Sequence, residues 1–77
     1  MNIIMYYPAA MRIDNVKSGS IMDIPEGTNI EALLKSCNVK KEHMKYILAY
    51  VNGEKRGMSH RLRHNDELKL YLPVGGG

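Results

Sequence analysis

The chain has 77 residues and a formal net charge of +3 at pH 7, and 44% of its residues are hydrophobic. This length suits one domain with a single core, and the hydrophobic content is too high for a disordered chain. The single cysteine, Cys37, excludes an internal disulfide and a cysteine-built metal cluster. No apolar run approaches the roughly 20 residues of a membrane span, and no signal peptide is evident. We therefore expect a cytoplasmic protein with no membrane partner.

The first third of the chain contains two candidate strands. Residues 3–7 are apolar on both faces, which is typical of a central strand. Residues 9–19 carry mixed signals and predict a connection or an irregular second strand. Residues 20–24 predict a strand with Met22 and Ile24 facing the core, because side chains alternate between the two faces of a strand.

A helix signal follows and begins at Thr28. The segment Thr28-Asn29-Ile30-Glu31 fits a capping box, in which the Thr28 hydroxyl accepts from a free backbone amide and Glu31 reaches back to a second one. Asn38 suits the left-handed conformation that ends many helices. Four apolar residues recur with helical spacing, namely Ile30, Leu33, Leu34 and Cys37. We expect a short helix that packs this stripe on a sheet and buries an unreactive Cys37 thiol.

The second half of the chain predicts a hairpin and a final strand. Residues 40–45 are polar and predict a connection. Residues 47–51 alternate as a strand up to Asn52-Gly53, a two-residue hairpin turn, and the returning strand is predicted at 55–58. After a second turn at 65–66, a last strand has one apolar face, made of Leu68, Leu70 and Leu72.

The order of these elements predicts the fold class. Strand, strand, helix, strand, short strand and strand describe an α+β fold of the β-grasp kind. We expect a mixed sheet of four to five strands with one main helix. The predicted domain spans residues 1–72, and residues 73–77 form a flexible glycine tail.

The tail itself suggests a chemical role. The chain closes with Pro73-Val74-Gly75-Gly76-Gly77 and a free carboxylate. Glycine loses much entropy when it is ordered, so three terminal glycines serve no purpose in packing. They are explained if the terminal carboxylate is the reactive group, because a backbone without side chains can pass through a narrow channel into another protein's active site. The four residues after Pro73 reach about 13 Å when extended.

Four segments in a fixed order carry a family resemblance. They are Ile24-Pro25-Glu26-Gly27-Thr28, Val51-Asn52-Gly53-Glu54, Asn65-Asp66-Glu67-Leu68 and Leu72-Pro73-Val74-Gly75-Gly76-Gly77. Over about residues 20–77 the chain resembles the ubiquitin-like sulfur-carrier family. This family includes the small subunit of molybdopterin synthase (MoaD-type) and the thiazole-forming carrier of thiamine synthesis (ThiS-type).

The resemblance implies a carrier protein rather than an enzyme. In this family an E1-like activating enzyme uses ATP and magnesium to adenylate the C-terminal glycine, sulfur replaces AMP to give a thiocarboxylate, and a synthase subunit accepts the sulfur. Carried over to this chain, Gly77 is the modified residue, Gly75 and Gly76 form the slender approach, and Pro73 and Val74 set the exit direction. The chain itself is expected to bind no cofactor and no metal.

The length and the Leu72-Pro73-Val74 exit favour the molybdopterin or tungstopterin branch, with the large subunit of molybdopterin synthase as the sulfur-accepting partner. The alternatives are thiazole synthase as the partner, and ubiquitin-like conjugation of Gly77 to a lysine amine. We expect partner docking on the open face of the last strands. The candidate docking residues are Leu70, Tyr71, Leu72 and Val74, with Arg61 and Arg63 as flanking cations.

The basic run over residues 55–64 supports an alternative from another class, a small RNA-binding β-grasp module. Its cations would meet phosphates, and Tyr50 and Tyr71 would stack on bases. His60 and His64 have the spacing of a helical metal-binding pair, but no third ligand lies nearby in the sequence. We therefore interpret these histidines as part of an exposed basic loop.

Overall fold

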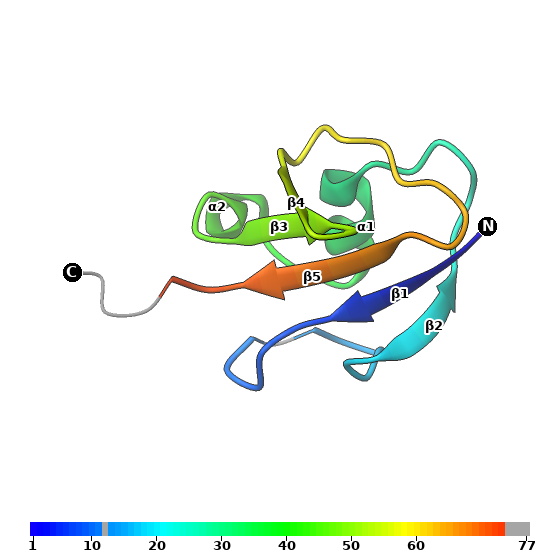
Figure 1. Cartoon of the computed structure of the whole chain (residues 1–77). Helices are drawn as coiled ribbons and strands as arrows, with labels where there is room; N and C mark the ends of the chain where they lie inside the picture. The colour runs from blue at the N-terminus through cyan, green and yellow to red at the C-terminus, as the bar shows by residue number, and fades with distance from the viewer. Residues whose placement is uncertain (12, 74–77) are drawn as a thin grey trace.

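The computed structural model describes residues 1–11 and 13–73 of the chain (Figure 1). Its elements in chain order are β1 (Asn2–Tyr6), β2 (Ser20–Asp23), α1 (Ile30–Ser36), α2 (Lys41–Met44), β3 (Leu48–Val51), β4 (Glu54–Arg56) and β5 (Glu67–Tyr71). The strands form one sheet in the order β2-β1-β5-β3-β4, in which β1 and β5 are parallel and the other neighbours antiparallel. This mixed sheet with one main helix confirms the predicted α+β β-grasp roll.

Alternation along the strands separates a buried face of the sheet from an open face. The residues on the buried face include Ile3 and Met5 of β1, Ala49 and Val51 of β3, and Leu68 and Leu70 of β5. The stripe of α1 covers this face, and its residues Ile30, Leu33 and Leu34 are at most 1% exposed. Each such burial contributes about 1.5–3 kcal/mol relative to exposure in water. The core therefore fixes the register of β5 between β1 and β3.

The helix α1 begins at a different cap from the predicted one. The Asn29 Oδ1 atom accepts from the backbone N–H of Ala32 at 2.8 Å, so Asn29 is the N-cap. The Thr28 hydroxyl instead donates to the Pro25 carbonyl at 2.6 Å. The predicted capping box is wrong, because the Thr28 carbonyl accepts from the Leu62 N–H at 2.9 Å and Thr28 is thereby held in the preceding turn.

The C-terminus of α1 agrees with the prediction. Asn38 adopts a positive φ of 64°. Its N–H donates to the Lys35 carbonyl and the Val39 N–H donates to the Leu34 carbonyl, both at 3.0 Å. This pair of hydrogen bonds is a Schellman motif. Cys37 just before it is 3% exposed, which confirms the predicted buried thiol.

The segment 40–45 is not a simple polar connection. Residues Lys41–Met44 form the short helix α2. The prediction missed this helix because its only buried residue is Met44, so the segment shows no apolar period. Met44 and Ile47, at 4% and 7% exposure, seal the core beneath α2.

The β3–β4 hairpin has the predicted turn. Asn52 and Gly53 both have positive φ, at 52° and 85°, as a type I′ turn requires. The returning strand β4 begins at Glu54, one residue before the predicted start. Among the residues that the structure describes, no helix has the length and apolar character to cross a membrane.

Candidate functional site

The last strand determines where the C-terminal residues leave the domain. β5 ends at Tyr71, and Leu72 and the exposed Pro73 follow it. Val74, Gly75, Gly76 and Gly77 lie outside the described residues. The roles predicted for these four residues, and the boundary of the tail at residue 73, therefore stay predictions.

An aromatic surface lies on the open face of the sheet beside the end of β5. We define the tyrosine face as Tyr6, Leu48, Tyr50, Lys69 and Tyr71. The register places Tyr6 and Tyr50 on either side of Lys69, and Leu48 beside Tyr71. Two open hollows of about 470 and 520 Å³ share Lys69 and Tyr71 in their linings.

Side-chain contacts order the tyrosine face. The rings of Tyr50 and Tyr71 pack edge to face, with centroids 5.4 Å apart. The Lys69 ammonium lies 5.7 Å from the centroid of the Tyr6 ring and 3.5 Å from a carboxylate oxygen of Glu67. Tyr71 remains 47% exposed and Tyr6 38% exposed. An exposed aromatic surface with one central cation is typical of a protein-docking surface.

One predicted docking residue is not available for docking. Leu70 is 2% exposed and its side chain faces the core. The reason is the strand period of two, which places Leu70 on the same face as Leu68 and on the opposite face from Tyr71. Leu72 is half-buried and packs against the core. The docking role predicted for Tyr71 and Leu72 stays a prediction.

The structure does not bring Arg61 and Arg63 close to the end of β5. Arg61 forms an antiparallel bridge with Asn29 at the start of α1, and the Arg63 N–H donates to the Asp66 carboxylate at 2.7 Å. Both precede β5, whereas the tail follows it. The five residues of β5 place about 13 Å between these ends, at about 3.3 Å per residue. In Figure 1 the loop before β5 and the end of β5 lie at opposite ends of the strand.

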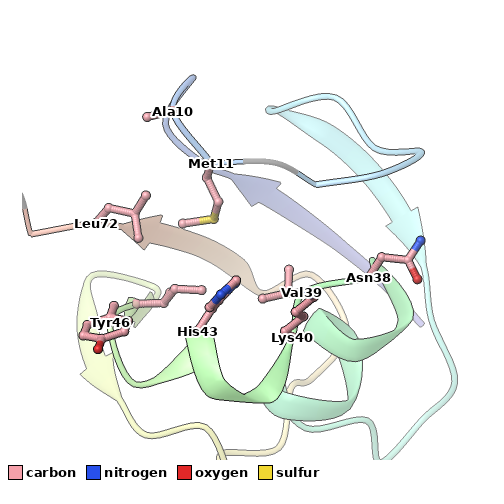
Figure 2. Close-up of a pocket in the computed structure, with 9 residues that line it drawn as sticks. Ala10, Met11, Asn38, Val39, Lys40, His43, Tyr46 and Leu72 are labelled. Carbon is pink, nitrogen blue, oxygen red and sulfur yellow. The ribbon is translucent and has the colours of Figure 1, made fainter.

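A groove lies on the other side of Leu72, next to α2. We call it the exit groove, and it has a volume of about 380 Å³. Its apolar residues are Ala10, Met11, Val39, Ile47 and Leu72, and the other residues that line it are Asn38, Lys40, His43 and Tyr46. Figure 2 shows Met11 and Leu72 opposite His43 and Val39 across this space.

Hydrogen bonds close the loop after β1 and join it to the end of α1, beside the exit groove. The Met11 N–H donates to the Pro8 carbonyl at 2.9 Å and closes a turn after β1. Asp14 ties the same loop to the end of α1, since its carboxylate accepts from the Asn38 side chain at 2.9 Å and its N–H donates to the Cys37 carbonyl at 3.3 Å. The groove is therefore formed by residues that are distant in the sequence.

The Cys37 thiol and the histidines were predicted to have no catalytic or metal-binding role. Burial raises the pKa of the Cys37 thiol, the nearby Ser36 hydroxyl opposes this shift, and the negative charge of Asp14 adds to it. A raised pKa keeps the thiol neutral and weakly nucleophilic. The His64 Nδ1 atom accepts from the Asn2 N–H at 2.9 Å. Within the described ranges, no three His, Cys, Asp or Glu side chains gather as a metal site.

Comparisons with known proteins agree with the architecture. No known protein-family profile and no curated protein matches the sequence. Among solved structures, the chain is similar to the crystal structure of SAMP1 from Haloferax volcanii, with a TM-score of 0.70, 18% sequence identity and coverage of 100% of both chains. The fold is a ubiquitin-like β-grasp.

The exit groove of this ubiquitin-like β-grasp was not among the sequence predictions. Its residues come from segments 10–11, 38–47 and 72, and the sequence contains no motif that joins them. The one available signal was the density of cations in residues 40–45, which includes Lys40, Lys41 and Lys45. Sequence reasoning assigned the important cations to Arg61 and Arg63 instead.

Proposed function

We propose that this chain is a ubiquitin-like sulfur carrier. In this proposal an E1-like enzyme uses ATP and Mg²⁺ to adenylate the carboxylate of Gly77, which is then converted to a thiocarboxylate. The observation that carries the proposal is the closing Gly75-Gly76-Gly77, which comes shortly after the last strand of a ubiquitin-like β-grasp. The chain acts as a carrier and the catalytic groups belong to its partners.

The proposed chemistry proceeds in two displacement steps. A carboxylate is a poor acylating agent, because its oxygen is a poor leaving group. The Gly77 carboxylate attacks the α-phosphorus of ATP, and pyrophosphate leaves. A sulfide ion (HS⁻) supplied by a donor then attacks the carbonyl carbon of the acyl adenylate, the C–S bond forms, and AMP leaves. The product is the thiocarboxylate of Gly77.

The body of the domain supports this chemistry by positioning. β5 lies between β1 and β3, and its last two residues, Leu70 and Tyr71, pair with Ala49 and Leu48 of β3. The four residues after Pro73 span about 13 Å if extended, which suffices to reach into a partner's active site. The tyrosine face and the exit groove flank Leu72 and offer docking surfaces on both sides of that exit.

We propose that the sulfur of the Gly77 thiocarboxylate is used in molybdopterin or tungstopterin synthesis. The partner that accepts it is then the large subunit of molybdopterin synthase. The support for this assignment is the chain length and the Leu72-Pro73-Val74 exit. Thiazole synthase is the alternative acceptor. A pull-down of the chain from its native cell distinguishes the two partners.

The experiment that tests the proposal is the intact mass of the chain purified from its native cell. Sulfur carriage predicts a species in which one oxygen of the C-terminal carboxylate is replaced by sulfur. Conjugation of Gly77 to lysine amines predicts instead branched glycine remnants on other proteins. If neither species is found in cells that express the activating enzyme, the proposal is wrong.

The RNA-binding alternative has its own discriminating measurement. Tyr50 and Tyr71 lie on the tyrosine face, whereas Arg61 and Arg63 precede the other end of β5. Arg61 and Arg63 are therefore separated from these rings along the strand, whereas Lys55 of the same basic run lies on β4 opposite Tyr50. Removal of Gly76 and Gly77 leaves RNA affinity unchanged if the chain is an RNA-binding module, and abolishes adenylation if it is a carrier.

A further inference from the structure

The exit groove and the tyrosine face are two separate surfaces. Tyr71 belongs to the open face of the sheet, whereas Leu72 turns toward the helical side and lines the exit groove. In Figure 2 the side chain of Leu72 points into the space between Met11 and Tyr46. A partner that holds the end of β5 therefore meets a second surface, which the docking prediction from sequence did not include.

The base of the exit groove suits one large apolar side chain. Met11, Val39 and Ile47 are each 7–9% exposed and line it with apolar atoms. Tyr46 stands at its edge with 58% of its surface exposed. A volume of about 380 Å³ lies near the lower end of the 300–1,000 Å³ that ligand pockets occupy, which accommodates a single side chain such as phenylalanine.

The rim of the exit groove carries one lysine, Lys40, together with His43. Two further lysines, Lys41 of α2 and Lys45 just after it, are exposed beside the groove. The ion pairs among the described residues use other cations, namely Lys35, Arg56, Lys69 and the N-terminal amine. The Lys45 ammonium instead lies 5.2 Å from the centroid of the Tyr46 ring.

Two acids lie near these cations. Glu42 belongs to α2 itself, and Asp14 accepts a hydrogen bond from the Asn38 side chain at 2.9 Å. Three lysines against these two carboxylates leave the surface around the groove positive. An apolar hollow bordered by a positive surface is complementary to a segment that is apolar in its centre and acidic in its flanks.

We propose that the exit groove binds an acidic segment that presents one large apolar side chain, on the protein that receives the tail. The apolar side chain enters the hollow between Met11, Tyr46 and Leu72, and the flanking carboxylates meet Lys40 and Lys41. Assignment of the segment to the tail-receiving protein rests on the proposed function. The binding chemistry of the groove does not.

The probe is a short blocked peptide with one central phenylalanine flanked on each side by glutamates. We expect it to shift the backbone amide resonances of Met11, Val39, Ile47 and Leu72 in a ¹H–¹⁵N spectrum of the whole chain. Its affinity should fall as salt rises, because the flanking charges are exposed. A peptide with glycine in place of phenylalanine should bind at least about fivefold more weakly, because it leaves the hollow empty.

Matched variants locate the site. Tyr46→Ala and Lys40→Glu should each weaken peptide binding about fivefold or more, since both side chains are exposed on the groove. The control is Lys55→Glu, an exposed charge reversal on β4 opposite Tyr50, which should leave the affinity unchanged. All three positions are on the surface, so the variants should fold, and their thermal unfolding is measured alongside.

The outcomes separate this inference from the proposed function. Shifts confined to Tyr6, Tyr50 and Tyr71 would overturn the groove assignment, and so would equal loss of affinity in the Lys55→Glu control. Peptide binding at the groove without any adenylation of Gly77 would leave the inference standing and disprove the carrier function. If adenylation by the activating enzyme and sulfur transfer to the synthase are both indifferent to Tyr46→Ala and Lys40→Glu, the assignment of the acidic segment to the tail-receiving protein is wrong.

Discussion

The two ends of β5 differ in what holds them and in what they expose. At the start of the strand, Asp66 is 7% exposed and accepts from the Asn52 side chain at 2.9 Å and from the Arg63 N–H at 2.7 Å. The Asn52 Oδ1 atom in turn accepts from the Glu67 N–H at 2.9 Å. At its other end, the strand finishes with the exposed Tyr71, and the half-buried Leu72 follows it.

The two ends of β5 therefore have different roles: the start anchors the strand, and the end lies beside exposed surfaces. The polar network before β5 joins the β3–β4 turn to the turn at Asn65, so it fixes the strand's start. The surfaces that suit partners, the tyrosine face and the exit groove, both lie beside the strand's end. A carrier benefits from this arrangement, because a rigid body keeps the departure point of the tail constant while its docking surfaces stay accessible.

The largest expected effect comes from the buried face of β5. Leu70→Ala should lower the free energy of unfolding by about 2–5 kcal/mol, since a fully buried leucine is replaced by a cavity. Tyr71→Ala, one residue later and on the open face, should cost far less. Urea denaturation of both variants measures the difference, and equal destabilisation would contradict the assignment of the two faces.

The second effect concerns the tail. Gly77→Ala should lower thiocarboxylate formation by about 100-fold, because a small misplacement of a reacting group costs this much in rate. The melting temperature should not change. The matched control is Gly57→Ala, a glycine with no atom within 4 Å of the added Cβ position. Undiminished transfer by Gly77→Ala, measured by intact mass after incubation with the activating enzyme, would refute threading of a bare backbone.

The third effect tests the network at the start of β5. Asp66→Ala leaves the Asn52 amide and the Arg63 N–H without their partner, which should cost about 1–3 kcal/mol of stability. Glu67→Ala beside it removes only an exposed contact to Lys69 at 3.5 Å and should change stability by less than about 0.5 kcal/mol. Thermal unfolding of the two variants provides the measurement. A larger loss for Glu67→Ala would show that the network does not stabilise this end.

The smallest expected effect is on the rate of association, and it distinguishes the cations near the end of β5 from those before its start. Charge reversal at Lys40 and Lys41 should slow association with the activating enzyme roughly three- to tenfold at low salt, and much less at high salt. Reversal of Arg61 and Arg63 should have a smaller effect, because these residues precede the start of β5. Stopped-flow association rates at two salt concentrations test this. A greater effect from Arg61 and Arg63 would restore the docking surface predicted from sequence.

The sequence by itself determined the elements whose signals are local. The spacing of Ile30, Leu33 and Leu34 predicted α1, Asn38 predicted its end, and Asn52-Gly53 predicted the hairpin. Each signal needs only neighbouring residues, because helix periods and turn conformations are set within a few positions of the chain. The glycine tail is likewise visible in the sequence, and its role stays a proposal.

Only the tertiary structure decided the features that depend on distant segments. Asn29 rather than Thr28 caps α1, since the Leu62 N–H from the loop before β5 takes the Thr28 carbonyl. The alternation along the last strand already placed Leu70 on its apolar face, but only the cover of that face by α1 buries Leu70 and removes it from the docking surface. The exit groove exists because folding brings Met11, Val39 and Leu72 together. Non-local packing of this kind leaves no periodic trace in the sequence, so it appears only when the chain is folded.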